Sequence, residues 1–141
     1  MTKNCCASEG NIMVLACSGV SNVGQLSNQA AIELTREGLG KMFCLAGIGG
    51  QLSGFVQSAK NVENMVAIDG CKVECVKAIL EQAEVPLKNH VVITNLGIEK
   101  NNEFTLKAED IVKVKSAVLD ICSKHSGNNL APSEKPFNCC G

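Results

Sequence analysis

The stretch that decides the fold is residues 11–24, which read NIMVLACSGVSNVG. Residues 11–16 form a short, nearly continuous apolar run, which is typical of a strand buried on both faces. The glycine-containing stretch from Cys17 to Gly24 then indicates a loop. From about residue 25 to 37, apolar side chains recur close to helical spacing and end at two glycines. This segment is therefore expected to fold as strand, loop and helix.

The same order of elements recurs along the rest of the chain. Strands are expected at residues 41–45, 65–68 and 90–95, a loop at 46–50, and helices at about 52–59, 71–83 and 107–123. Buried strands that alternate with helices predict a parallel sheet covered on both faces. The expected fold is thus a three-layer αβα sandwich with a mostly parallel sheet of about four strands, Rossmann-like or flavodoxin-like.

The chain of 141 residues fits a single domain with two short extensions. Residues 11–125 form the expected α/β domain. Residues 1–10 are a cysteine-containing N-terminal extension, and residues 126–141 are an irregular C-terminal tail that ends in a cysteine pair.

The charge balance bears on partners and location. A formal net charge of −1 and a pI of about 6.1 predict neither a nucleic-acid nor an anionic-membrane partner. The start of the chain is polar, and no apolar run reaches the roughly 18 residues that span a bilayer. We expect a cytoplasmic protein that binds a metal ion.

Nine cysteines in so short a chain are a strong excess, and an odd number cannot pair completely. Under reducing conditions, metal binding, redox chemistry or burial as small apolar groups are the expected uses. Cys17, Cys44 and Cys71 each follow an expected strand, so a parallel sheet brings all three to its carboxyl edge. Cys75, four residues after Cys71, is expected one turn along the same helix face. These four thiols fit tetrahedral zinc, and the helix N-terminus is expected to favour their thiolates.

Four residues are expected to support this site: Ser18, Gly19, Asp69 and Gly70. The glycines allow sharp turns and close backbone approach, and Asp69 is expected to cap the following helix through its side chain.

Other candidate ligands have weaker support from the sequence. Vicinal pairs in the extensions could add ligands, form a second metal site, act as transfer thiols or simply oxidise; they are Cys5, Cys6, Cys139 and Cys140. Cys122 lies on the apolar stripe of the last helix and is expected in the core. His90 and His125 are expected to be structural or surface residues rather than ligands.

The sequence argues against two functions, phosphatase-type catalysis and nucleotide binding. A strand, Cys17, a glycine-bearing loop and a helix also occur in low-molecular-weight phosphatases and related arsenate reductases, but their arginine is replaced here by Val23. Without that guanidinium, phosphoryl oxygens lose their bidentate partner. Residues 47–50 complete neither a Walker loop nor a dinucleotide fingerprint.

Ordered motifs across residues 10–123 carry a family resemblance. They are Cys17-Ser18-Gly19, CLAGIGG at 44–50, AIDGCKVECVK at 67–77 and NLGIEK at 95–100. Together they resemble the DGC-domain family of zinc-binding proteins. The resemblance implies zinc on the shared cysteines, which match Cys17, Cys44, Cys71 and Cys75, and it implies no particular reaction.

Two classes of function follow. The first is a zinc-binding protein, structural or engaged in metal or metalloid handling. The alternative is a thiol-dependent redox, sulfur-transfer or arsenical-processing enzyme with Cys17 or Cys71 as nucleophile. An iron–sulfur cluster or another thiophilic metal is a further alternative to zinc. Whether the protein is an enzyme stays open at this point, and no catalytic residue is assigned.

Overall fold

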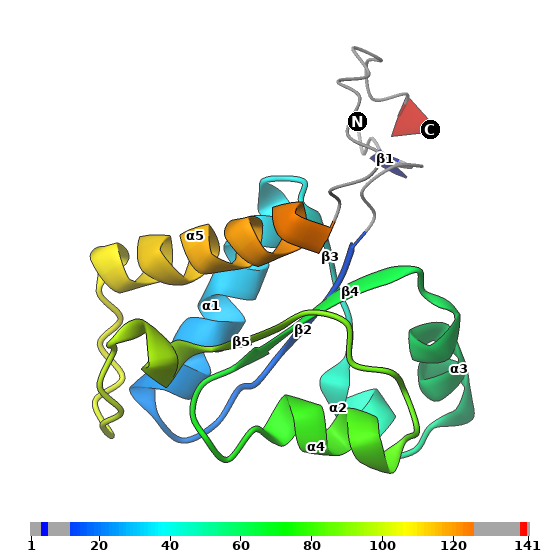
Figure 1. Ribbon diagram of the computed structural model, residues 1–141, viewed down its shortest axis with the longest axis horizontal. Coiled ribbons are helices and arrows are strands. Elements are labelled where there is room, and N and C mark those ends of the chain that lie inside the picture. Colours follow the sequence, from blue (N-terminus) through cyan, green and yellow to red (C-terminus); the bar gives the residue numbers. More distant parts are fainter. Residues whose placement is uncertain (1–3, 6–11, 126–138, 141) are drawn as a thin grey trace.

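The computed structural model of the chain describes residues 4–5, 12–125 and 139–140 (Figure 1). The central sheet has four parallel strands in the order β3-β2-β4-β5. Their bounds are β2 Ile12–Ala16, β3 Gly40–Met42, β4 Asn64–Asp69 and β5 His90–Val92. The helices are α1 Asn22–Arg36, α2 Leu45–Gly49, α3 Ser53–Asn61, α4 Cys75–Gln82 and α5 Ala108–His125, with a 3-10 turn, η1, at Ile93–Leu96.

Helices cover both faces of this sheet, so the predicted three-layer fold is confirmed (Figure 1). Alternation along β2 divides the core, because successive side chains point to opposite faces. Ile12 and Val14 pack with residues of α1 and α5. Met13 and Leu15 pack with residues of α2, α3 and α4. Among the described helices, none is long and apolar enough to cross a membrane.

Several element boundaries differ from the prediction. Helix α1 begins at Asn22, earlier than expected, because the Ser21 hydroxyl accepts a hydrogen bond from Gly24 N at 3.2 Å and caps the helix. Strand β3 is short, and the expected loop at 46–50 is mostly helix α2. Glycine suggested a loop there, but a Cβ on Gly47 would lie 2.6 Å from the Phe55 ring. The glycine serves close packing rather than a turn.

The fourth strand also ends before its predicted boundary. β5 stops at Val92, and the chain enters η1, where Thr94 N donates to the Gly70 carbonyl at 3.2 Å. Gly97 then ends η1 with φ of 83°, in the left-handed region that glycine adopts readily. The end of the strand is therefore tied to the turn after β4.

The two extensions contribute one small element. Strands β1, Asn4–Cys5, and β6, Cys139–Cys140, pair antiparallel and form a separate two-stranded ribbon. Figure 1 places this ribbon beyond the amino end of β2, away from the carboxyl edge of the main sheet. Cys6 and the side chains of the other terminal candidates, Cys5, Cys139 and Cys140, lie outside the described part of the chain, as does the side chain of His125.

Candidate metal centre at the carboxyl edge of the sheet

The order of the strands reverses direction next to β2, and this switch point lies at the carboxyl edge of the sheet. From β2 the chain goes first to β3 on one side and then to β4 on the other. Ligands of open parallel sheets bind in the crevice outside the strand ends at such a point. Cys17 directly follows β2, Cys71 follows β4 after Gly70, and Cys44 follows β3 after Phe43. The predicted delivery of three cysteines to the ends of three neighbouring strands therefore agrees with the topology.

Cys17 lies at the centre of this edge. Its N–H donates to the Ile68 carbonyl at 2.9 Å, which extends the pairing of β2 with β4 past the strand end. Burial raises the pKa of the Cys17 thiol, a backbone hydrogen bond from Gly70 opposes that rise, and the charges of Cys75, Asp69 and Cys71 add to it. The expectation that the helix N-terminus lowers the pKa of this thiol therefore does not hold at Cys17, where burial outweighs the hydrogen bond from Gly70.

Cys71 and Cys75 flank a tight turn rather than sharing a helix face. Helix α4 begins only at Cys75, and Glu74 before it has the left-handed angles φ 56° and ψ 52°. Glu74 N donates to the Cys71 carbonyl at 3.0 Å, which closes the turn. The predicted helix from residue 71 is therefore wrong at its start. Left-handed backbone in a non-glycine residue is uncommon and concentrates at functional sites.

Asp69, the last residue of β4, caps the start of α4. Its carboxylate accepts hydrogen bonds from Val76 N at 2.8 Å and Lys77 N at 3.3 Å, and it contacts His90 Nε2 at 2.8 Å. The residue is 1% exposed. The predicted capping role of Asp69 is confirmed, and His90 has the structural role expected for it. The residue directly before α4, Glu74, makes no side-chain capping hydrogen bond, so Asp69 supplies the capping hydrogen bonds instead.

Close backbone approach holds the cysteine loops together. A Cβ on Gly70 would lie 2.8 Å from the Val23 carbonyl carbon, and one on Gly24 would lie 2.6 Å from Gly19 N. The turn after β4 therefore packs directly against the first turn of α1 and the loop after Cys17. Of the predicted supporting residues, Gly19 would bring a Cβ to 3.8 Å from the Cys17 sulfur, and Ser18 is exposed.

Cys44 occupies the N-cap position of α2 and is exposed, as is Cys75. Phe43 N donates to the Val14 carbonyl at 3.0 Å, so the backbone continues along β2 just before Cys44. Among the residues that the structure describes, no three cysteine, histidine, aspartate or glutamate side chains are close enough to hold a metal as they lie. The donors are nevertheless of the right chemistry for a thiophilic metal.

Two residues of this edge were missed from the sequence. Lys100 Nζ donates to Cys71 Sγ at 3.5 Å. Lys100 is the last residue of the NLGIEK motif, and nothing in the neighbouring sequence indicates that this loop reaches Cys71. Thr94 Oγ1 is buried at the start of η1 and has no hydrogen-bond partner in the described residues. Cys122, by contrast, lies in the core as predicted, and burial raises its pKa.

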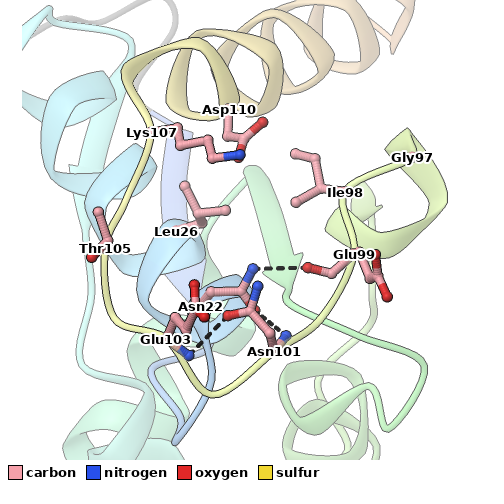
Figure 2. A pocket seen from close by; sticks show the side chains of 10 residues that line it. All are labelled: Asn22, Leu26, Gly97, Ile98, Glu99, Asn101, Glu103, Thr105, Lys107 and Asp110. Atoms are coloured by element: carbon pink, nitrogen blue, oxygen red, sulfur yellow. Dashed lines mark hydrogen bonds between the residues drawn. The ribbon is translucent and has the colours of Figure 1, made fainter.

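A separate cavity of about 420 Å³ lies beside this edge, between the start of α1, the loop after η1 and the start of α5 (Figure 2). Asn22 holds that loop: its amide donates to the Glu99 carbonyl at 2.8 Å, and its side-chain oxygen accepts from Asn101 N at 2.7 Å. Glu103, Lys107 and other polar residues line the cavity. Asn22 therefore anchors the loop that carries Lys100.

These features define a class of protein: a small parallel α/β domain with cysteines just beyond the carboxyl ends of three neighbouring strands. The sequence profile of the DGC domain matches residues 13–118. The chain therefore belongs to the DGC-domain family. No solved structure gives a significant match to it.

A curated relative gives the same result. The chain is 39% identical over 98 residues to the "Anaerobic and virulence modulator AnvM" of Pseudomonas aeruginosa. The aligned region covers 70% of this chain and 75% of that protein. The similarity thus extends over most of both chains.

Proposed function

We propose that this protein binds zinc through cysteine thiolates at the carboxyl edge of its sheet, with Cys17, Cys71 and Cys75 as the first ligands and Cys44 as the fourth. The observation that supports this most is the position of Cys17 at the switch point, close enough to Cys71 and Cys75 for their charges to raise its pKa. Three negatively charged sulfur atoms repel one another, and a divalent cation removes that repulsion.

The surrounding framework supports the same proposal. Backbone contacts at Gly24 and Gly70 fix the two inner loops against each other, and Asp69 fixes the start of α4. The exposed side chains of Cys44 and Cys75 can change rotamer at little packing cost. A fixed frame with mobile outer ligands suits a site that closes when the metal arrives. We expect this to happen in the cytoplasm, where reducing conditions favour free thiols as metal ligands.

Zinc titration of the reduced, metal-free chain against a chromophoric chelator tests the proposal. Wild-type protein is expected to withdraw about one zinc per chain. Cys17→Ser and Cys71→Ser are expected to lose at least tenfold in affinity, because each removes a central ligand. Cys122→Ala is the matched control, since Cys122 lies in the core between α5 and the sheet. Unchanged affinity in both ligand variants would refute the assignment.

A second candidate function is thiol chemistry at Cys71. The supporting observation is Lys100, whose ammonium donates to Cys71 Sγ and provides a positive charge beside that sulfur. Cys17 fits the role of nucleophile less well, because burial raises its pKa. Under this function, iodoacetamide would label Cys71 before Cys44 and Cys75 in metal-free protein, and Lys100→Met would slow the labelling. Equal labelling rates would argue against a nucleophilic Cys71.

A further inference from the structure

The two ends of the chain meet in the β1–β6 ribbon, and both ends carry cysteines. In the register of this antiparallel pair, Cys5 lies directly opposite Cys139, and Asn4 lies opposite Cys140. Neighbouring positions of a strand alternate between its two faces. Positions 5 and 139 therefore share a face of the ribbon, and position 140 lies on the other.

The main domain has both of its chain ends on one side. In Figure 1 the start of β2 and the end of α5 lie at the same end of the domain. The two elements from which the extensions continue, β2 and α5, thus begin and end on the side of the domain nearest the ribbon (Figure 1). This end of the molecule is opposite the carboxyl edge with Cys17 and Cys71.

We propose that Cys5 and Cys139 form a reversible disulfide that joins the two ends of the chain. Opposed residues of an antiparallel pair have Cα atoms roughly 4.5–5.5 Å apart, within the roughly 4.4–6.8 Å that a disulfide spans. The link closes almost the whole chain into a loop, and long loops restrict the unfolded state most. It is a redox-dependent clasp that does not depend on the zinc site.

The oxidant is a low-molecular-weight disulfide such as oxidised glutathione. One cysteine thiolate attacks this disulfide, which forms a mixed disulfide and expels the first glutathione thiolate. The second cysteine thiolate attacks the protein sulfur of the mixed disulfide and expels the second glutathione. Two cysteines lose two electrons in total, one glutathione disulfide gains them, and the two protons end on the released thiols.

Peptide mapping of the full-length protein after incubation with oxidised glutathione tests the clasp. Free thiols are alkylated, trypsin is added, and the peptides of residues 4–36 and 125–141 are expected to be joined through Cys5 and Cys139, as fragment spectra identify. Reductant is expected to separate them. The melting temperature should rise on oxidation and fall back on reduction, because the closed loop limits the unfolded chain.

Two double variants give matched arms. Cys6→Ser with Cys140→Ser keeps the opposed pair and should retain the link. Cys5→Ser with Cys139→Ser keeps the other two terminal cysteines and should lower the yield of linked peptide at least tenfold. Equal linkage in the two variants would overturn the proposal. So would links that join only separate molecules, or a wild-type protein that shows no link.

Discussion

At the scale of single residues, the site depends on a carboxylate as much as on sulfur. Asp69 is buried and serves three partners at once, two backbone N–H groups of α4 and the ring of His90. A buried group that is left without partners costs more than the hydrogen bond itself contributes. Asp69 therefore determines where Cys75 lies, although it contributes no sulfur.

Replacement of Asp69 should lower stability. Asp69→Ala removes the cap of α4 and the partner of His90, so the free energy of unfolding should fall by about 1–3 kcal/mol. Urea denaturation in the presence of a chelator measures this without interference from metal. Asp120→Ala is the control: its carboxylate is exposed, pairs with Lys124 at 3.0 Å, and its loss should cost less than about 0.5 kcal/mol. Equal losses in both variants would contradict the capping role.

The raised pKa of Cys17 predicts a pH dependence of zinc binding. A raised pKa means that the thiol keeps its proton to higher pH, so zinc must displace that proton at neutral pH. Zinc affinity should therefore rise between pH 6 and pH 8. In Cys17→Ser the slope of log affinity against pH should be smaller by about one proton. Chelator competition at several pH values gives both slopes, and identical slopes would count against Cys17 as a ligand.

At the scale of elements, the prediction worked where burial determines the pattern and failed where a contact with a distant part of the chain decides. The apolar run of β2 and the stripe of α5 identified those elements from local sequence. Helix α2 was missed because its glycines indicate a loop, whereas the reason for Gly47 is Phe55, further along the chain. The start of α4 was misplaced because Asp69 caps it from β4 and Glu74 takes left-handed angles that no sequence pattern marked.

Two glycines near helix starts should respond in opposite ways to alanine. Gly24→Ala would place a Cβ 2.6 Å from Gly19 N, so the Cys17 loop must shift and stability should fall by about 1–3 kcal/mol. Gly54 in α3 has no atom within 4 Å of such a Cβ, so Gly54→Ala should raise stability by up to about 1 kcal/mol. Urea denaturation compares the two. A stabilised Gly24→Ala variant would refute the close packing of the Cys17 loop.

At the scale of the whole molecule, the sheet separates two groups of cysteines. Strand order brings Cys17, Cys44 and Cys71 to the carboxyl edge, and this much could be predicted because parallel strands end on one side. The sequence could not predict that Cys5 pairs in register with Cys139, because that depends on where α5 finishes relative to β2. Lys100 was missed for the same reason, since a loop held by Asn22 brings it to Cys71.

A metal that binds only the folded chain should stabilise all of it. The proposed zinc would join loops that follow three strands, so its free energy of binding would add to the free energy of folding. Chelation of the purified protein should therefore lower the melting temperature, and zinc should restore it. Differential scanning calorimetry with and without chelator checks this. An unchanged melting temperature after demonstrated removal of the metal would argue against zinc that links the loops.

The central claim concerns which atoms hold the metal. X-ray absorption at the zinc edge of the loaded, reduced protein counts the sulfur neighbours. We predict three or four sulfur atoms at about 2.3 Å in the wild type, and one fewer in each of Cys17→Ser, Cys71→Ser and Cys75→Ser. A shell of nitrogen and oxygen alone, or a sulfur count that none of these variants changes, would contradict a zinc centre at the carboxyl edge of the sheet.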